Sequence, residues 1–415
     1  MGIFVILYQV EIMSLFDSIN VKDYTYTLPA NYIANYPAEK RGDSSLLIYR
    51  DGIVTDEKFK NIGAYLNTDD LLVFNKTKVV QARLLFRKES GAGIEVFCLE
   101  PLRPVSELSE AFLCKKKVVW KCLIGGLKKW KSGKLFIKRN NLVLCAERTG
   151  FTDNAFEVTF SWEGDDLSFG EVLEIFGHIP LPPYIKRDSE EIDSIRYQTV
   201  FASEKGSVAA PTAALHFTDA LIDEVVNTRK CKTAYLTLHV GAGTFKPIDT
   251  SVENHVMHTE QLLVDLETIA RIRQNVQKNS VIAVGTTSLR TLESMYWLGV
   301  NIHEGLINPM HVTQFKPYEK ESRLSATDAL SALEDYISRN TSECLKASTG
   351  LMILPGYDFK IANKLITNFH QPGSTLLLLV AAFIGEEWKN VYQHALENNY
   401  RFLSYGDACF FSLKK

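Results

Sequence analysis

The sequence lacks the features that mark disulfide-rich, zinc-binding, membrane-spanning and strongly basic proteins. Its seven cysteines are odd in number and scattered, and none forms a C-x-x-C pair, which argues against zinc ribbons and redox motifs. Such cysteine usage fits a reducing cytoplasm. The longest apolar runs, at residues 1–10 and 376–384, are too short to cross a bilayer. A formal net charge of −3 carries no global nucleic-acid signature, so any such contact requires a local patch.

The apolar first residues have neither a basic n-region nor a small-residue cleavage site. We interpret residues 1–12 as an edge strand or as an over-extended start upstream of Met13. We therefore expect a cytoplasmic protein without a membrane segment.

What is present is the composition of a globular protein, with 46% hydrophobic and 23% charged residues. A chain of 415 residues exceeds one ordinary core, so we expect at least two domains. Residues 79–160 alternate in the manner of short strands separated by turns, which is typical of a small barrel or sandwich. The expected strands in this part are 94–99, 118–124, 134–138, 142–145 and 155–160.

Beyond a proline-rich connector at 177–184, helical and strand patterns alternate, which is the signal of an α/β fold. We predict an α/β fold class, in which a large α/β domain built from both chain ends (1–78 and 178–415) carries an inserted small antiparallel β-barrel domain (79–177). The expected strands of the large domain are 71–74, 233–240, 281–284 and 351–354. The expected helices are 57–66, 220–229, 265–278, 288–297, 359–365, 375–384 and 387–397, with an accessory helix within 315–346.

Three segments share one design, in which an apolar strand runs into a loop of Gly, Ser, Thr or His residues and a helix follows. They span residues 235–244, 281–288 and 365–375. Loops at the carboxyl ends of strands form the ligand crevice of open α/β sheets, and helix starts offer backbone N–H groups to anions. Two of these strands lead to His239 and His370, and histidine suits proton transfer near neutral pH. The pattern indicates an enzyme.

Two further segments allow both a functional and a purely structural interpretation. Residues 206–218 are rich in small side chains and present His216 before a helix, either beside a ligand or in a tight loop under the sheet. The hydroxyls at 286–288 are either ordinary N-cap groups or, together with Arg290, a clamp for a carboxylate or phosphate. A first-turn arginine opposes the helix dipole, which favours the functional interpretation of Arg290.

The motif H-x-x-H-x-E at 255–260 suggests a metal site, but no third ligand stands at a familiar zinc spacing, so a polar or orienting contact is favoured. Residues 400–407 bring Tyr405 and Asp407 together in a segment too apolar to be a free tail. Between Lys115 and Arg139 lie ten basic residues and no acidic one, with two tryptophans interleaved. This run is either a solvated surface or the place that grips a phosphate backbone.

Long motifs over nearly the whole chain resemble one known family, the S-adenosylmethionine:tRNA ribosyltransferase-isomerases of queuosine biosynthesis. The motifs that carry the resemblance are Y-T-L-P at 26–29, L-V-F-N at 72–75, I-P-L-P-P-Y at 179–184, R-Y-Q-T-V at 196–200, residues 206–218, L-H-V-G-A-G-T-F at 238–245, H-x-x-H-x-E at 255–260, A-V-G-T-T-S-x-R-T-L-E-S at 283–294, P-G-Y at 355–357, residues 365–379 and residues 400–407.

The resemblance implies transfer and isomerisation of the ribosyl moiety of S-adenosylmethionine onto 7-aminomethyl-7-deazaguanine at the tRNA wobble position. The products are epoxyqueuosine-tRNA, adenine and methionine. It implies S-adenosylmethionine as co-substrate, tRNA as partner and no metal; we expect a monomer. The candidate catalytic residues are His216, His239, His370 and Asp407. The candidate co-substrate residues are Gly241, Gly243, Thr244, Thr286, Thr287, Ser288, Arg290, Asn368, Ser374 and Tyr405. The candidate tRNA-binding residues are Arg41, Lys115, Lys116, Lys117, Lys128, Lys129 and Lys131.

In the implied reaction, the sulfonium acidifies neighbouring C–H bonds, and His216, His239 or His370 takes a proton near the ribose C5′. Asp407 or a second histidine helps adenine to leave. Arg290, or the helix start at Ser374, binds the methionine carboxylate. We expect these side chains to surround a single ligand.

The chain departs from the family pattern at three sites. They are Ser45 in place of an arginine, Ala214 in place of a glycine, and Q-P-G-S at 371–374 in place of L-P-K-S. Two alternatives therefore stay open. One is a divergent paralogue that binds tRNA without turnover, and the other is a transferase that uses S-adenosylmethionine on another nucleoside or small molecule.

Overall fold

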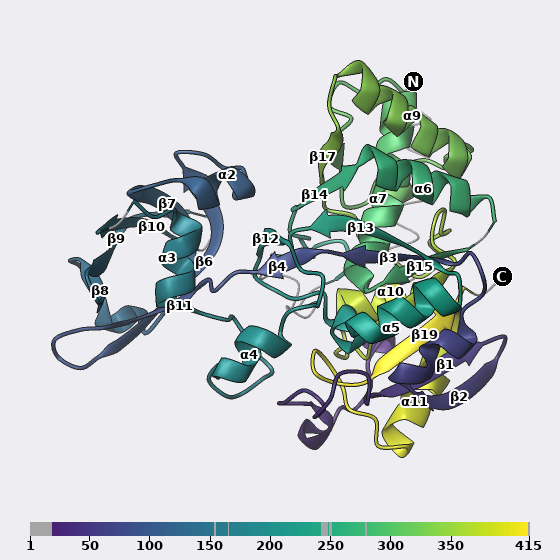
Figure 1. Ribbon diagram of the computed structural model, residues 1–415, viewed down its shortest axis with the longest axis horizontal. Helices are drawn as coiled ribbons and strands as arrows, with labels where there is room; N and C mark the ends of the chain where they lie inside the picture. Colours follow the sequence, from purple (N-terminus) through teal and green to yellow (C-terminus); the bar gives the residue numbers. More distant parts are fainter. Residues whose placement is uncertain are drawn as a thin grey trace.

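The computed structural model describes residues 19–152, 155–164, 166–241, 248, 251–278 and 280–413. Its largest element is a mixed sheet of ten strands to which both the early and the late parts of the chain contribute (Figure 1). In spatial order the strands are β16 (His311–Val312), β17 (Cys344–Thr349), β14 (Glu260–Asp265), β13 (Lys232–Leu238), β3 (Leu71–Asn75), β15 (Val281–Val284), β18 (Lys364–Asn368), β19 (Ala408–Ser412), β1 (Ser45–Arg50) and β2 (Ile53–Lys58).

The centre of this sheet is parallel, because β13, β3, β15 and β18 run in the same direction. Their carboxyl ends therefore meet at one edge of the sheet. The early strand β1 pairs in parallel with the late strand β19, with Leu46 opposite Ala408. This pairing closes the large domain from segments that lie more than three hundred residues apart in the sequence.

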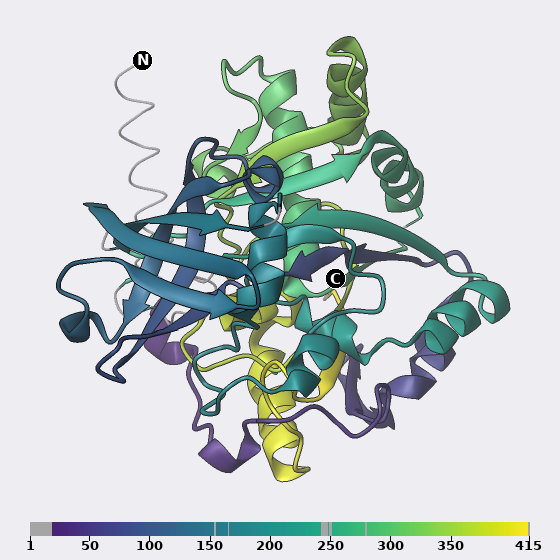
Figure 2. The same ribbon diagram turned by 60° about the vertical axis from the view of Figure 1, so that its left-hand side comes forward.

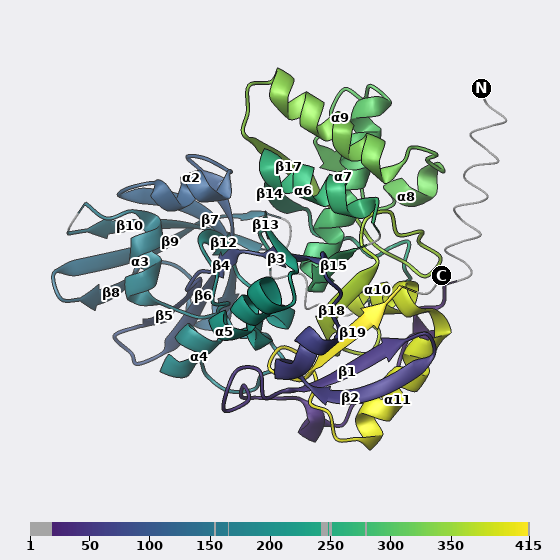
Figure 3. The same cartoon turned by 45° about the vertical axis from the view of Figure 1, so that its right-hand side comes forward.

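Alternating residues of the central strands pack into two different cores, one on each face of the sheet. Leu71 and Val73 join the core under the helices α6, α7, α9, α10 and α11, whereas Leu72 and Phe74 join the core under α5 and two short 3-10 helices. Strands that are buried on both faces read as continuous apolar runs, which is why residues 71–74 are recognisable from the sequence. Figure 3 shows α6 and α9 toward one end of the large sheet and α11 beside β1 and β2 at the other.

The helices fill in the covering layers of both domains. The α-helices are α2 (Leu108–Leu113), α3 (Phe169–Phe176), α4 (Glu191–Arg196), α5 (Asp219–Asp223), α6 (Leu266–Val276), α7 (Thr286–His303), α8 (Lys316–Glu319), α9 (Ala326–Arg339), α10 (Thr375–Ile384) and α11 (Trp388–Glu397). The short 3-10 and π segments are η1 (Val21–Asp23), η2 (Ala30–Tyr32), η3 (Phe59–Tyr65), η4 (Leu127–Lys129), η5 (Thr212–His216), η6 (Glu224–Thr228) and η8 (Gly385–Glu387).

A second, seven-stranded sheet is antiparallel throughout and curls beside the large sheet (Figures 1 and 2). Its strands are, in order, β11 (Gly177–His178), β5 (Arg83–Arg87), β6 (Gly93–Arg103), β7 (Lys117–Gly125), β10 (Ala155–Glu163), β9 (Leu142–Thr152) and β8 (Leu135–Arg139). Apolar side chains of α3 pack inside the curl and form its core with the strands. The predicted fold class, an α/β domain with a small antiparallel β domain inserted, is confirmed, while the limits 79 and 177 stay a prediction.

A parallel pair, β4 (Thr77–Val79) and β12 (Glu204–Ser207), lies where the chain passes from the large sheet into the curled one (Figure 1). Among the described residues, no helix combines the length and apolar content that crossing a bilayer requires. The interpretation of residues 1–12 as an edge strand or an over-extended start lies outside the described residues.

Two predicted elements of the large domain are wrong. Residues 351–354 form no strand, because the N–H groups of Leu351 and Leu354 donate to side-chain hydroxyls instead of to a neighbouring strand. Residues 359–365 form no helix. The buried carboxylate of Glu293 accepts the N–H groups of residues 360, 361 and 362, at 2.9, 3.0 and 3.1 Å. The N–H of Asn363 donates to the Val281 carbonyl at 3.1 Å instead of to residue 359, as a helix would require. Apart from Thr349, these partners lie far away in the sequence, so the local pattern of the two segments does not show them.

Candidate functional site

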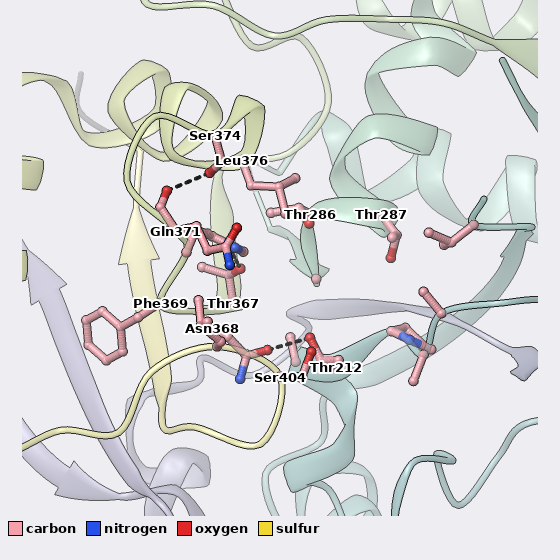
Figure 4. A pocket seen from close by; sticks show the side chains of 18 of the residues that line it. Thr212, Thr286, Thr287, Thr367, Asn368, Phe369, Gln371, Ser374, Leu376 and Ser404 are labelled. Carbon is pink, nitrogen blue, oxygen red and sulfur yellow. Dashed lines mark hydrogen bonds between the residues drawn. The ribbon is translucent and has the colours of Figure 1, made fainter. Parts of the chain in front are cut away.

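A cavity of about 700 Å³ lies at the carboxyl ends of β13, β15 and β18 (Figure 4). It is lined by segments from four distant parts of the chain: residues 209–213, Gly285 to Thr287, Thr367 to Gln371, and Leu403 with Ser404. Tyr184, Val240, Ser374 and Leu376 complete the wall. The three strand–loop–helix segments of the sequence therefore converge here, as expected for the crevice of a parallel sheet.

Two helices begin at this cavity. Gly285 ends β15 and starts α7 with φ of 95°, a backbone conformation that a residue with a Cβ rarely adopts. Ser374 caps α10, since its Oγ accepts the Leu377 N–H at 3.2 Å. Both helix starts turn partial positive charge toward the cavity, which suits a carboxylate.

Thr287 contributes a buried hydroxyl that has no hydrogen-bond partner among the described residues. The residue lies in the first turn of α7 and lines the cavity (Figure 4). A buried hydroxyl without a partner costs free energy, so a polar group of a ligand would satisfy it.

Asn368 connects the cavity wall to His216 through a buried chain of hydrogen bonds. Thr212 Oγ1 donates to Asn368 Oδ1 at 2.8 Å (Figure 4), and Asn368 Nδ2 lies 3.2 Å from His216 Nε2. Nδ1 of the same imidazole lies 2.7 Å from Ser44 Oγ. His216 is therefore one residue removed from the cavity lining and contacts it through Asn368.

His370 is the histidine among the three candidates that lines the cavity itself. Its Nε2 lies 2.9 Å from Thr367 Oγ1, and its backbone N–H donates to the Tyr392 hydroxyl at 3.1 Å. Burial lowers the pKa of His370 to about 3. Burial, with the charges of Arg401 and Arg41, also lowers the pKa of His216 to about 3. Both rings are neutral at pH 7 and accept a proton as weaker bases than an exposed imidazole.

His239 lies in an adjoining hollow between the large sheet and the curled one. Its Nδ1 lies 3.2 Å from Thr77 Oγ1, and burial lowers its pKa to about 4. Gly206 packs directly under the ring, since a Cβ at this position would lie 2.5 Å from Nδ1. Gly206, in the segment 206–218, therefore makes room for the His239 ring of the protein itself. Val240, the next residue after His239, lines both hollows.

Arg290 turns away from the main cavity and forms a buried ion pair. Its Nη1 donates to Glu260 Oε2 at 2.6 Å and its Nε to the Leu351 carbonyl at 3.2 Å, with the two side chains only 6% and 2% exposed. Its Nη2 has no hydrogen-bond partner in the described part of the chain. Arg290 lines a separate hollow that shares Leu376 with the main cavity. The expectation that His216, His239, Arg290 and His370 surround one shared cavity is wrong, because they line four adjoining ones.

Two expected co-substrate residues, Ser288 and Tyr405, and the expected catalytic residue Asp407 serve the framework. Ser288 donates to the Val284 carbonyl at 2.8 Å, and Tyr405 donates to Asp193 Oδ1 at 2.7 Å. Asp407 accepts the N–H groups of Ser45 at 2.9 Å and Arg401 at 2.7 Å. None of these three lines the main cavity. The two hydrogen bonds that Asp407 accepts hold residues 401–407 against β1. This agrees with the prediction that the segment 400–407 is not a free tail.

Gly241 lies beside the hollow of His239, where its N–H donates to Glu260 Oε1 at 3.3 Å. Gly243 and Thr244 lie outside the described residues. The expected pair of His255 and His258 lies in a loop and not on a helix face. Within the described part of the chain, no three His, Cys, Asp or Glu residues are grouped so as to hold a metal ion.

The six candidate lysines of the basic run are exposed on the curled sheet and its loops, at positions 115–117, 128, 129 and 131. Trp120 and Trp130 are not exposed with them, because both pack in the core of that sheet. Arg41 lies elsewhere, near His216, and donates to the carbonyls of residues 195, 198 and 215.

Sequence reasoning missed Ser44, Thr212, Thr367 and Ser404 as polar groups of the site. Thr367 lies in the segment 365–375 and Ser404 in the segment 400–407, both of which the sequence indicated. Thr212 follows a proline in the segment 206–218. Their hydroxyls carry no distinguishing spacing. Ser44 precedes a strand far from the others in sequence, and only the pairing of β1 with β19 brings it near.

Residues 21–411 match the family described as queuosine biosynthesis protein. A relative from Trichlorobacter lovleyi named S-adenosylmethionine:tRNA ribosyltransferase-isomerase is 36% identical over 397 residues, which cover 94% of this chain and 98% of the relative. A relative of the same name from Vesicomyosocius okutanii is 37% identical over 393 residues, 94% of this chain and 97% of its own. A crystal structure of S-adenosylmethionine tRNA ribosyltransferase from Thermotoga maritima matches with a TM-score of 0.45 and 27% identity over 94% of this chain and 99% of that one. With a family match over nearly its whole length, this chain belongs to the queuosine biosynthesis protein family.

Proposed function

We propose that this protein transfers and isomerises the ribosyl moiety of S-adenosylmethionine onto 7-aminomethyl-7-deazaguanine at the tRNA wobble position, as an S-adenosylmethionine:tRNA ribosyltransferase-isomerase. Epoxyqueuosine-tRNA, adenine and methionine are the products. The observation that carries the proposal is the convergence of residues 209–213, 285–287 and 367–371 with Ser374 on one cavity. Relatives with this name, matched almost end to end, support the same activity.

The lining of the cavity fits S-adenosylmethionine in polarity and charge. Among the described residues that form it, none carries a formal charge, so a sulfonium cation meets no repelling arginine or lysine. Two helix starts face it and suit the carboxylate of the methionyl part. The partnerless hydroxyl of Thr287 and the ordered pair Thr212–Asn368 offer hydrogen bonds to a nucleoside.

When bound, S-adenosylmethionine supplies the ribosyl group and acidified C–H bonds next to its sulfonium. Of the histidines considered as base, we favour His370, because it lines the cavity and its Nε2 is oriented by Thr367. A neutral imidazole is the state that accepts a proton. We assign His216 to orienting Asn368, and Ser374 rather than Arg290 to the carboxylate, since the arginine is engaged by Glu260.

The direct test is incubation of the full chain with S-adenosylmethionine and substrate tRNA, with free adenine as the readout. Adenine release that depends on the tRNA supports the proposal. Binding of tRNA without adenine indicates a paralogue without turnover. Adenine release with a different acceptor indicates another sulfonium-using transferase. His370→Ala is expected to abolish turnover, and near-normal turnover in the alanine variants of His216, His239 and His370 alike would contradict the proposed roles.

For the tRNA we propose contacts from the exposed lysines of the curled sheet at 115–117, 128, 129 and 131. Simultaneous exchange of Lys128, Lys129 and Lys131 for glutamate is expected to weaken tRNA binding most strongly at low salt. Unchanged binding across salt concentrations would remove this run from the interface. We also predict a monomer, which sedimentation tests, and domain limits at 79 and 177, which limited proteolysis tests. A cytoplasmic location remains our prediction.

A further inference from the structure

A third hollow, of about 310 Å³, adjoins the main cavity and is surrounded by cationic side chains. Ser404 lines both spaces, and His216 in this hollow contacts Asn368 in the other. Four basic residues stand around it: Lys40, Arg41, Arg196 and Arg401. They come from the segment before β1, from the end of α4 and from the turn before β19.

Backbone carbonyls, not carboxylates, hold two of these arginines in place. Arg41 donates to the carbonyls of residues 215, 195 and 198 at 3.2, 2.9 and 2.7 Å. Arg196 donates to the carbonyls of residues 38 and 39 at 2.7 and 3.1 Å. Carbonyls fix a guanidinium without neutralising its charge, so its electrostatic field persists in the hollow.

Little negative charge compensates this group. Within the described part of the chain, Lys40, Arg41 and Arg196 form no ion pair, and Arg401 shares Asp407 at 3.3 Å with two backbone N–H groups. Asp193, the nearby acid of α4, is engaged by Arg187 at 2.7 Å. Burial and then the charge of Arg196 lower the pKa of Arg41, and the smaller opposing effects of Tyr405 and Asp219 do not cancel them. Half-buried cations that the fold holds close together repel one another. An anion that binds between them relieves this repulsion.

We propose that this hollow binds a phosphodiester group of the tRNA chain next to the nucleotide that enters the main cavity. The inference rests on the proposed function, because the substrate there is a polyanion. Guanidinium groups match phosphate oxygens in pairs, and their fixed planes give orientation as well as charge. The site adjoins the cavity, whereas the basic run of residues 115–131 lies on the separate curled sheet (Figure 1). The hollow therefore positions the reacting nucleotide, and the lysines would add non-specific attraction.

The experiment measures tRNA affinity of the full chain as a function of salt for Arg196→Gln, Lys40→Gln and the control Arg339→Gln. Arg339 is an exposed residue of α9 that pairs loosely with Asp335 at 3.8 Å and lies outside the hollow. The Lys40 side chain is exposed, so we expect Lys40→Gln to leave the fold unchanged. This variant therefore still tests the proposal if Arg196→Gln is unstable. Circular dichroism and thermal unfolding confirm folding of each variant.

We expect each of the two hollow variants to raise the Kd for substrate tRNA about tenfold near physiological salt. Between about 50 and 200 mM salt, the slope of log K against log salt should flatten by about 0.7 to 0.9, the value of one lost phosphate contact. Arg339→Gln should behave as the unchanged protein. If the unchanged protein binds tRNA and releases adenine while both hollow variants keep its affinity and slope, the phosphodiester site is refuted and the proposed function stands. If the unchanged protein binds no tRNA, the proposed function fails first.

Discussion

The side-chain amide of Asn368 donates from Nδ2 to Nε2 of His216 across 3.2 Å, inside the wall of the main cavity. Because Thr212 donates to Oδ1 of the same amide, the orientation of Asn368 is set from both sides. Nε2 then accepts, so the neutral ring carries its proton on Nδ1 and donates it to Ser44. A residue outside the cavity thereby orders the polar groups inside it.

This relationship predicts that Asn368→Asp is far more harmful than its size suggests. A carboxylate cannot donate to Nε2 or to the Asp407 carbonyl, so His216 must change tautomer or become protonated, and a buried negative charge faces that carbonyl. We expect adenine release to fall by at least about tenfold, as for loss of one oriented hydrogen bond of about 1.4 kcal/mol. Asn390→Asp, an exposed site on α11, is the matched control and should retain activity. Equal activity of the two variants would show that the amide orientation is irrelevant.

The partnerless hydroxyl of Thr287 predicts a separation of binding from stability. Thr287→Val removes no hydrogen bond of the protein, so the free energy of unfolding should stay within about 0.5 kcal/mol. The KM for S-adenosylmethionine should rise about tenfold because a ligand contact is lost. Thr291→Val one turn later is the control, since Thr291 donates to the Thr287 carbonyl at 2.9 Å and lies outside the cavity lining. A stability loss without a KM change at Thr287 would disprove a ligand role.

The ion pair of Arg290 and Glu260 predicts strong coupling in a double-mutant cycle. Arg290→Met removes the cation that pairs with the buried Glu260 carboxylate and should cost about 3–5 kcal/mol in urea unfolding, while Arg290→Met combined with Glu260→Met recovers most of this loss. Arg339→Met, at an exposed pair, should cost less than about 1 kcal/mol. If Arg290→Met instead raises the KM for S-adenosylmethionine with normal stability, the arginine binds substrate after all.

Two buried neutral histidines predict a loss of stability in mild acid. Burial lowers the folded-state pKa of His216 and His370 from 6.5 to about 3, so the unfolded chain binds more protons between these values. Stability is therefore greatest above pH 6.5 and falls as the pH drops toward 3. From pH 7 to pH 5 each histidine should account for roughly 2 kcal/mol of the decrease. Urea unfolding at both values tests this, and His370→Gln should show a smaller decrease by that amount. An identical pH dependence in the variant would contradict the buried neutral state.

Patterns in the sequence were sufficient for the elements whose burial is continuous or alternating. Residues 71–74 and 281–284 are apolar on both faces and became the central parallel strands. The alternation in 94–160 became the curled sheet. Where a distant group takes a backbone N–H, the pattern fails, as at 359–365, where the Val281 carbonyl accepts the Asn363 N–H that a helix would bond internally.

What the sequence by itself determined is the order of strands, loops and helices, and hence that three polar loops follow strands of one parallel sheet. Period and burial are properties of neighbouring residues, so they are legible along the chain. Only the tertiary structure decided that His370 lines the cavity, that His216 lies behind it and His239 in an adjoining hollow, and that Arg290 turns to Glu260. The reason is physical: a side chain takes the partner that strand register and packing bring within about 3 Å, and neither is encoded in the spacing of its own segment.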